Sequence, residues 1–199
     1  FKMLVGKGHQ EFSSNRQQDA SEYLDIFLLY ASKSHLNNSN RQKAEKKAKL
    51  DDITKLFEFK VYTKLSCQEC HSYKLNEANS QDIQLPIPKP TSFKKEVNPT
   101  TEKEEEIPLV KFKECVDSWQ TEIVELNCPT CSKKTFFKKT YYFKTWPKYL
   151  FAVTNRIMLE NWVPKKNNSE IVFDSETFDF SKAILPPEQP DEKRIAGTK

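Results

Sequence analysis

The sequence is poor in glycine, which accounts for only 3 of its 199 residues. It contains neither a GxGxxG pattern nor a Walker motif, which excludes the glycine-rich loops that cradle phosphate groups. It also lacks any run of about 20 uncharged apolar residues, the length that a membrane-spanning helix needs. The apolar run at its N-terminus is too short for a signal peptide. We therefore expect neither a phosphate-binding loop nor a transmembrane segment.

A large excess of charge of one sign is absent as well. The sequence has 32 Lys and Arg against 28 Asp and Glu, which leaves a formal net charge of +4. Lys and Glu are interleaved along the chain, whereas a nucleic-acid-binding protein concentrates its basic residues on one face. We interpret these charges as a solvated surface and expect neither nucleic acid nor a membrane as a partner.

Recognisable catalytic machinery is missing too. A cysteine hydrolase needs a thiolate, a base within hydrogen-bond reach and an orienting Asn or Asp. The three histidines, His9, His35 and His71, do not lie in settings that suggest a general base. The sequence contains no GxSxG elbow and no HExxH motif. From its own residues we expect this chain to carry no catalytic group.

The sequence does contain one strong helical pattern, followed by segments typical of strands. A helix over residues 15–34 is predicted by apolar side chains at helical spacing: Ala20, Tyr23, Leu24, Phe27, Leu28 and Ala31. Ser14 and Gln17 have the spacing of a capping box at its start. A short helix is predicted around Phe112–Trp119, and extended segments at 57–67, 71–85, 134–143, 149–159, 171–173 and 178–180. This mixture predicts an α+β domain.

Three segments have few residues to bury. Residues 37–52 are polar and Lys-rich, and we expect an exposed loop or a solvated helix there. Residues 89–108 are rich in Lys, Glu and Pro, which predicts a mobile insertion or long loop. The Pro- and charge-rich residues 184–199 are expected to be disordered.

Four of the five cysteines form two CxxC pairs, Cys67 with Cys70 and Cys128 with Cys131. Each CxxC turn can place two thiolates on one metal ion, and two such turns complete a tetrahedral shell of four sulfurs. The long gap between the pairs requires two hairpins that the fold brings together. We expect one structural Zn²⁺, because four thiolates leave no open position for a substrate water.

Other interpretations of the cysteines remain open. The site could be degenerate and empty, or it could carry redox chemistry. Cys67 to His71 also matches the CxxCH pattern of c-type haem attachment, although haem would leave the second pair unexplained. His71 is expected to lie beside the first turn rather than to bind the metal. Cys115 is expected to be a small buried hydrophobic residue.

A family resemblance rests on several of these motifs. The segment Gly6–Ala20 reads GKGHQEFSSNRQQDA, and with Glu22, Tyr23 and Leu24 it resembles the QQDAxEFL helix of the ubiquitin-specific proteases. The part before QQDA is similar to the isopeptidase T branch of that family, whose fungal members dismantle free ubiquitin chains. The two CxxC pairs resemble the zinc-bearing fingers of the family. Trp146–Val153 resembles its palm strand LPxxLxxxLKRF, and residues 162–166 are again similar to the isopeptidase T branch.

The resemblance implies an incomplete papain-like ubiquitin-specific protease fold, with all parts belonging to one catalytic domain. Residues 1–36 would form the thumb-side helix, 53–88 the first half of the fingers and 89–110 a flexible insertion. Residues 111–183 would form the second half of the fingers and the palm strands, and 184–199 a disordered tail. The family's nucleophile box and its GHY-type histidine motif do not occur here. We therefore expect an internal fragment that is inactive alone.

The resemblance also implies ubiquitin and polyubiquitin as partners. The parent would be a cysteine-type deubiquitinase that hydrolyses the bond after the C-terminal glycine of ubiquitin and acts on free chains. Asp19 and Glu22 would pair with the arginines of the ubiquitin tail, although both acids also suit the first turn of a helix. The alternatives are a non-catalytic ubiquitin-binding zinc module and a zinc-ribbon nucleic-acid binder. Reduced cysteines favour the cytoplasm, and the nucleus is equally compatible.

Overall fold

The computed structural model describes residues 5–14, 19–42, 52–100, 102–187 and 192–195. The chain divides into two compact units. The first comprises Phe1–Glu58 and Pro147–Phe151, and the second comprises Phe59–Trp146 and Ala152–Lys199. In the described part of the chain, no helix is both long and apolar enough to cross a membrane.

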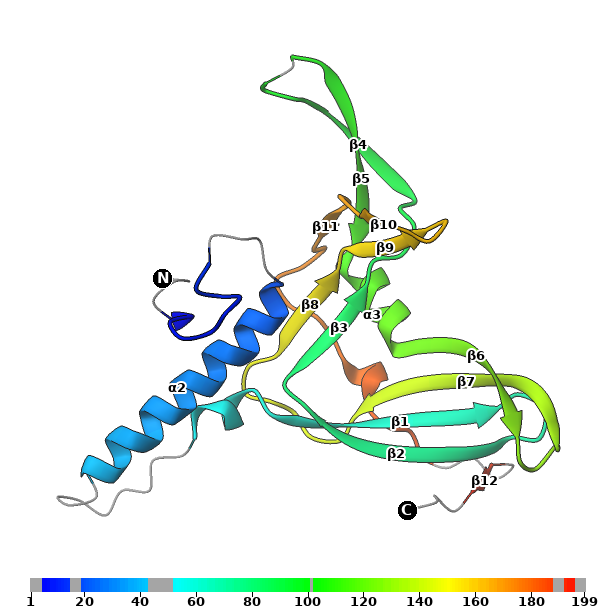
Figure 1. Ribbon diagram of the computed structural model, residues 1–199. Coiled ribbons are helices and arrows are strands. Elements are labelled where there is room, and N and C mark those ends of the chain that lie inside the picture. The colour runs from blue at the N-terminus through cyan, green and yellow to red at the C-terminus, as the bar shows by residue number, and fades with distance from the viewer. Residues whose placement is uncertain (1–4, 15–18, 43–51, 101, 188–191, 196–199) are drawn as a thin grey trace. The chain divides into compact units, whose positions relative to one another are not determined.

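The first unit is built around helix α2 (Ala20–Gln42) (Figure 1). Leu28 on its apolar stripe is 3% exposed, and the ring of Tyr23 contacts the buried ring of Phe12 at 5.4 Å between centroids. The predicted stripe is therefore confirmed except at Ala20, which is exposed. The helix runs further than the predicted end at residue 34 and ends at Gln42. The predicted capping box lies partly outside the described residues, because it uses Gln17.

The first unit also contains a short 3₁₀-helix, η1 (Ile53–Leu56). Its N-cap is Asp52, whose Oδ1 accepts a hydrogen bond from the backbone N–H of Thr54 at 3.0 Å. Phe57, directly after η1, stacks on the ring of Phe151 with 4.7 Å between centroids. A cap and an aromatic stack thus fix the chain where it leaves this unit.

The second unit contains most of the strands. In chain order the strands of the protein are β1 (Phe59–Cys67), β2 (Ser72–Ser80), β3 (Asp82–Pro86), β4 (Ser92–Val97), β5 (Glu104–Lys111), β6 (Thr121–Cys128), β7 (Lys133–Phe143), β8 (Phe151–Asn155), β9 (Ile157–Glu160), β10 (Val163–Lys166), β11 (Glu170–Val172) and β12 (Lys193–Arg194). The helices of this unit are α3 (Phe112–Gln120) and the 3₁₀-helix η2 (Ser181–Ala183). With α2, these elements confirm the predicted α+β class.

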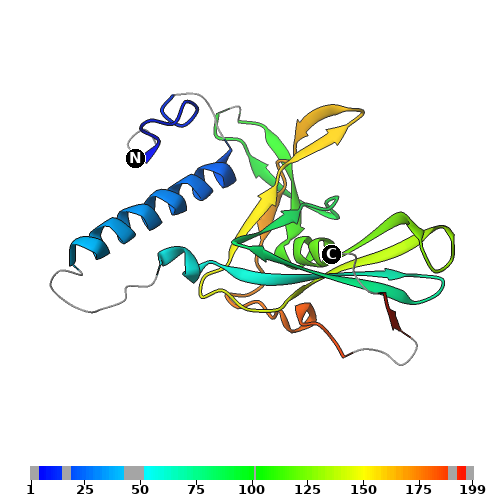
Figure 2. The same cartoon turned by 60° about the horizontal axis from the view of Figure 1, so that its bottom comes forward.

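The largest sheet has the strand order β12-β2-β1-β7-β6. Its centre consists of two antiparallel hairpins, β1–β2 and β6–β7, which lie side by side (Figures 1 and 2). Antiparallel pairing of β1 with β7 joins the hairpins, from Val61 opposite Phe143 to Cys67 opposite Phe137. We call this the hairpin sheet. The smaller sheets are β11-β5-β4, β3-β8 and β9-β10.

Helix α3 packs the core of the second unit against the hairpin sheet. Cys115, Val116 and Trp119 are its buried residues, at the spacing of one helix face. The indole of Trp119 stacks on Tyr141 of β7 with 5.7 Å between centroids and also contacts Phe143 at 5.6 Å. The prediction that Cys115 is a buried apolar residue is confirmed, because it is 0% exposed.

The prediction of an unstructured loop over residues 89–108 is wrong. This segment contains β4 and most of β5, which pair as an antiparallel hairpin (Figure 1). Lys and Glu residues are common in loops, but in this segment they pair with residues on other strands. Lys95 contacts Glu104 at 3.7 Å, and Lys94 contacts Glu170 of β11 at 2.6 Å. Val110 of β5 is 1% exposed, so the base of the hairpin belongs to the core.

Two expectations about the C-terminal third also need correction. Residues 178–180 are not a strand; they lead into η2, and the ring of Phe180 packs edge-on against Phe143. The described residues of the predicted disordered tail make ordered contacts. Ile184 forms a bridge with Phe143, and β12 extends the hairpin sheet. Composition could not reveal this order, because the contacts are made with residues far away in the sequence.

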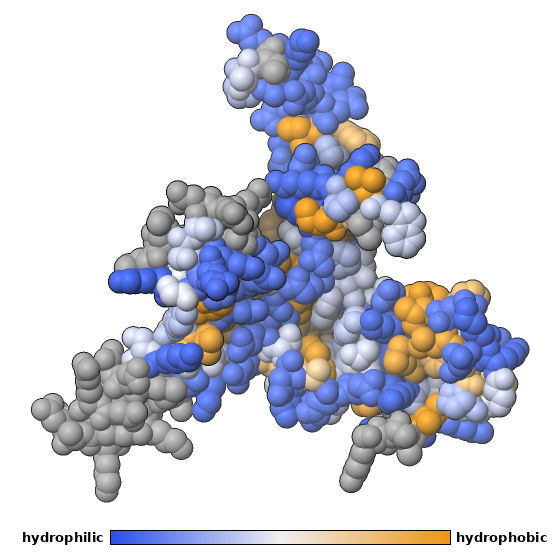
Figure 3. All heavy atoms as spheres, in the orientation of Figure 1, coloured by the Kyte–Doolittle hydropathy of each residue, from blue (hydrophilic) through white to orange (hydrophobic). Residues whose placement is uncertain are grey.

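Exposed apolar side chains gather over β6 and β7 and over the β9–β10 hairpin (Figure 3). On the first surface Ile123 is 56% and Phe136 59% exposed. On the second, Trp162 is 91% exposed at a turn where Asn161 and Trp162 both have positive φ. Exposed apolar patches of this kind often mark contact surfaces for other proteins.

Candidate metal centre

The two CxxC pairs lie at the same end of the hairpin sheet. Cys67 is the last residue of β1, and Cys128 is the last residue of β6, so each pair forms the turn of one hairpin. Because β7 pairs with both β1 and β6, it places the two turns next to each other. The prediction that two separate hairpins bring the pairs together is confirmed.

The two turns have the same backbone conformation. In the first, the backbone N–H of His71 donates to the carbonyl of Cys67 at 3.2 Å, and in the second Ser132 donates to Cys128 at 2.8 Å. Both donor residues are left-handed, with φ of 56° at His71 and 54° at Ser132. This conformation normally favours glycine, which the sequence hardly contains. Each turn closes tightly enough to direct both of its sulfurs to one point.

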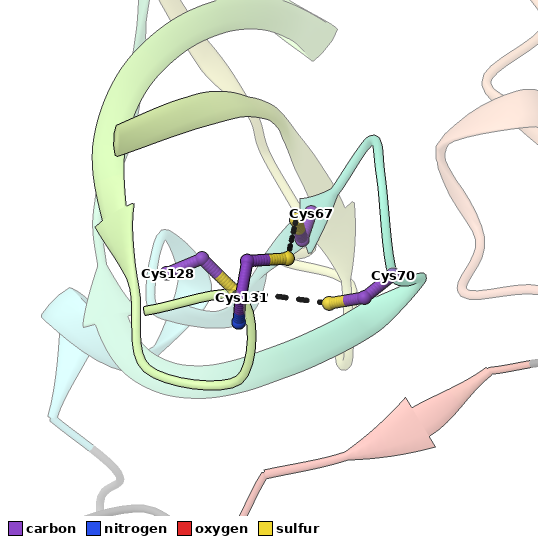
Figure 4. Close-up of side chains that lie close together, drawn as sticks. All are labelled: Cys67, Cys70, Cys128 and Cys131. Atoms are coloured by element: carbon purple, nitrogen blue, oxygen red, sulfur yellow. Dashed lines mark hydrogen bonds between the residues drawn. The ribbon is translucent and has the colours of Figure 1, made fainter. Parts of the chain in front are cut away.

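The four sulfurs form a compact group (Figure 4). The Sγ atoms of Cys67 and Cys131 are 3.8 Å apart, and those of Cys70 and Cys128 are 3.7 Å apart. All four Sγ atoms lie within 4.8 Å of one another. A tetrahedral Zn²⁺ with Zn–S bonds of about 2.3 Å would have sulfurs about 3.8 Å apart. The spacing therefore fits one tetrahedral metal ion.

The surroundings of Cys67 and Cys70 favour the thiolate form of these two sulfurs. Burial opposes ionisation of Cys67, but the Thr135 hydroxyl and backbone N–H groups of the turn donate to its sulfur and lower its pKa to about 6. The hydroxyl of Ser72, 3.0 Å from the sulfur of Cys70, lowers the pKa of that thiol. Cys131 shares its proton with neighbouring sulfurs, Cys70 foremost, which raises its pKa. A metal cation would replace that shared proton.

The donor set also indicates what such an ion would do. Cys67 and Cys128 are 0% and 1% exposed, and all four thiols are free rather than joined in disulfides. Four thiolates fill a tetrahedral shell, so no position remains for a reacting water. The centre is therefore suited to fixing two hairpins together. An exposed ion pair between Glu69 and Lys133, 2.7 Å apart, makes a further link between the turns.

His71 and Cys115 lie outside the sulfur group, as predicted. His71 is exposed beside the first turn. Burial raises the pKa of the Cys115 thiol, which makes it a poor nucleophile. Ser72 and Thr135, whose hydroxyls contact the sulfurs, were not predicted from the sequence. The available signal was that each hydroxyl closely follows a CxxC pair, because Ser72 comes shortly after Cys70 and Thr135 shortly after Cys131.

The two acids predicted to bind a substrate tail lie at the start of α2 in the first unit. Oδ1 of Asp19 accepts hydrogen bonds from the backbone N–H groups of Ser21 at 2.7 Å and Glu22 at 3.2 Å. Asp19 therefore caps the helix, and Glu22 is an exposed acid in its first turn. The cap uses one carboxylate oxygen of Asp19, and the negative charges of Asp19 and Glu22 both remain at the surface.

Comparisons with known proteins give a consistent result. A sequence profile of the family described as "Ubiquitin carboxyl-terminal hydrolase" matches residues 1–196. The chain is 29% identical over 194 residues to "Ubiquitin carboxyl-terminal hydrolase 14" of Schizosaccharomyces pombe, covering 96% of this chain and 23% of that protein. It is 29% identical over 211 residues to "Ubiquitin carboxyl-terminal hydrolase 5" of Mus musculus, covering 98% and 23%. The chain thus spans less than a quarter of either relative.

Solved structures show a similar fold. The SAGA Ubp8/Sgf11/Sus1/Sgf73 DUB module bound to ubiquitin aldehyde contains a chain that matches with a TM-score of 0.62 and 19% identity. The match covers 94% of this chain and 38% of that chain. A second structure of that module, bound to monoubiquitin, matches with a TM-score of 0.57 and 20% identity, covering 85% and 34%. At this identity the likeness concerns the fold alone.

Proposed function

The chain belongs to the ubiquitin carboxyl-terminal hydrolase family, and on this basis we propose that it is the middle part of the catalytic domain of a cysteine-type deubiquitinase. The whole protein would hydrolyse the bond after the C-terminal glycine of ubiquitin, with free polyubiquitin chains as its substrate. The observation that carries the proposal is the group of four cysteine sulfurs at the end of two paired hairpins, within a chain that the family profile matches almost throughout.

In this proposal the cysteine centre holds one structural Zn²⁺. Support comes from the sulfur spacing of 3.7 and 3.8 Å and from the hydroxyl groups that favour thiolates. The ion would keep the hairpin sheet rigid, so that its surface can hold the globular body of ubiquitin. The exposed apolar side chains over β6 and β7 are candidates for that contact.

The start of α2 would bind the Arg-rich tail of ubiquitin through Asp19 and Glu22. Both carboxylates are exposed, and the helix start fixes their positions. An ion pair between a carboxylate and an arginine gives both affinity and register, since the two groups pair through parallel hydrogen bonds.

The attacking thiolate and the general-base histidine would come from sequence outside residues 1–199. Four of the five cysteines belong to the metal centre, and the fifth, Cys115, is fully buried with a raised pKa. The parent's cysteine thiolate would attack the carbonyl of the terminal glycine and expel the amine of the scissile bond, which takes up a proton from the histidine and leaves an acyl-enzyme thioester. Water would then hydrolyse the thioester, freeing the glycine carboxylate and regenerating the thiol. Metal-binding thiolates must stay reduced, so we place the protein in the cytoplasm, with the nucleus equally compatible.

The test is hydrolysis of free polyubiquitin by the full-length protein, with residues 1–199 as the control. We expect cleavage by the former and none by the latter. Failure of the folded full-length protein to cleave would favour a non-catalytic ubiquitin-binding zinc module. Cleavage by residues 1–199 alone would contradict the placement of the nucleophile.

The same assay tests the tail contact with variants that preserve the helix cap. Asn caps a helix as well as Asp does, so Asp19→Asn with Glu22→Gln removes both charges and keeps α2 intact. We expect KM to rise about 10- to 100-fold with little change in kcat, because a charge-assisted hydrogen bond is worth about 1.5–3 kcal/mol and about 1.4 kcal/mol corresponds to a factor of ten. An unchanged KM would exclude the contact.

A further inference from the structure

Residues 192–195 lie along the edge of the hairpin sheet; we call them the C-terminal strap. Its strand β12 runs parallel to β2, with Lys193 opposite Ser72 and Arg194 opposite Tyr73 (Figure 2). The backbone N–H of Ile195 donates to the carbonyl of Tyr73 at 2.8 Å, and that of Lys193 donates to His71 at 3.4 Å. The strap therefore covers the part of the β2 edge that directly follows the first cysteine turn.

A second anchor of the strap is an ion pair on the face of the sheet. Nζ of Lys64, on β1, lies 2.6 Å from Oε1 and 2.7 Å from Oε2 of Glu192. The two side chains are only 9% and 16% exposed, and the Lys64 ammonium lies 4.6 Å from the centre of the Tyr73 ring. A lysine is almost never buried without a partner. Glu192 is the only strap residue that neutralises this charge, so the pair fixes the strap in one register.

The strap is connected to the metal centre through Ser72. The backbone of Ser72 pairs with the strap, while its hydroxyl lies 3.0 Å from the sulfur of Cys70 and 3.8 Å from that of Cys128. The carbonyl of His71, the left-handed residue that closes the first turn, accepts a hydrogen bond from the strap as well. The strap thus holds the two residues that follow Cys70 by their backbone.

We propose that the C-terminal strap is a clamp on the cysteine centre, so that docking of residues 192–195 and metal binding at the four cysteines strengthen each other. The inference rests on the proposed zinc site. When the strap is docked, Ser72 and His71 are held in the positions that direct Cys70 toward the other sulfurs. When metal is bound, the edge of β2 is held in the shape that the strap pairs with. Such coupling is reciprocal by thermodynamic necessity.

Release of the strap would have two consequences. It would leave the Lys64 charge without its carboxylate partner, and it would expose the backbone groups of the β2 edge near the metal centre. An exposed strand edge pairs readily with another extended segment. Metal retention in this protein would therefore depend on residues 192–195, which are far from the cysteines in the sequence.

The test uses the full-length protein with Zn²⁺ bound and measures transfer of the metal to a chromophoric chelator. Glu192→Gln keeps the shape of the side chain and removes its charge. The matched control is Glu125→Gln, which removes an exposed ion pair with Lys134 on the other hairpin. At equilibrium with the chelator, we expect Glu192→Gln to bind zinc about tenfold more weakly than the wild type, within the usual range of coupling between sites. The control should stay within about twofold.

A second experiment tests the reverse effect, that of metal binding on the strap, by measuring amide hydrogen exchange at residues 192–195. This measurement does not depend on enzyme activity. Removal of zinc, or Cys128→Ser, should accelerate exchange of the Ile195 amide about tenfold, matching the loss of zinc affinity in Glu192→Gln. If Glu192→Gln binds zinc as tightly as the wild type, and the strap is equally protected in the zinc-free protein, the clamp is overturned and the zinc site is left intact. A wild-type protein that binds no zinc would overturn both.

Discussion

Replacing Trp119 with alanine should strongly destabilise the packing of α3 on the hairpin sheet. The indole is 8% exposed and contacts both Tyr141 and Phe143. A buried tryptophan removes about 150–250 Å² from water, and at about 25 cal/mol per Å² this amounts to roughly 4–6 kcal/mol as an upper bound. Measured Trp→Ala changes in protein cores cost about 3–5 kcal/mol. Trp119 also lines a cavity of about 590 Å³, which water can enter to fill the space left by the indole. We therefore expect a loss of about 3–4 kcal/mol.

Native-state hydrogen exchange measures the loss of stability at the individual amides of α3 and of the hairpin sheet. Amides of α3 and β7 should exchange roughly 10²–10³-fold faster in Trp119→Ala, since about 1.4 kcal/mol corresponds to a factor of ten. The chain provides its own control, because Trp162 is 91% exposed and Trp162→Ala should change stability by no more than about 0.5 kcal/mol. Equal protection of β7 in the two variants would refute the reasoning that α3 and the hairpin sheet share one core.

Three further outcomes follow from local features. Cys128→Ser should abolish zinc binding as measured by atomic emission, whereas Cys115→Ser should retain one zinc per chain; equal zinc contents would exclude the four-sulfur site. Ser132→Gly should raise the melting temperature, since a left-handed residue other than glycine costs about 1 kcal/mol. The control Ser92→Gly should lower the melting temperature, because glycine weakens a strand such as β4. Asp52→Ala should lose about 1 kcal/mol of cap stability near neutral pH. The hydrogen bond from the Thr54 backbone N–H lowers the pKa of Asp52, so its contribution is complete above the unfolded value of 3.8 and is lost as pH falls through the folded pKa. Acid titration of wild type and variant should therefore show their stabilities converging at low pH, and a constant difference would contradict this.

Local patterns predicted the elements that a few neighbouring residues specify. The stripe of α2, the strands at both CxxC pairs and the face of α3 follow from spacing alone, because each element buries one face at its own period. The family resemblance, carried by the QQDA segment and the CxxC pairs, is confirmed by the profile match over residues 1–196. The β4–β5 hairpin was missed because its Lys and Glu residues have loop composition. In the folded chain these residues find partners on neighbouring strands, such as Glu104 of β5 for Lys95 and Glu170 of β11 for Lys94.

The sequence by itself determined which four cysteines could form a metal site, since two CxxC pairs are typical of such sites, and it predicted the helix that begins directly after Asp19 and contains Glu22. Tertiary structure decided which groups surround the sulfurs. Pairing of β1 with β7 brings together turns that are almost 60 residues apart, and it places the Thr135 hydroxyl against Cys67. The order of residues 192–195 was likewise decided by tertiary contact, because a buried Lys64 needs a carboxylate and Glu192, 128 residues away, supplies it. Spacing along a chain encodes local turns and faces, whereas the charge and hydrogen bonds of a site depend on residues that only the folded sheet brings together.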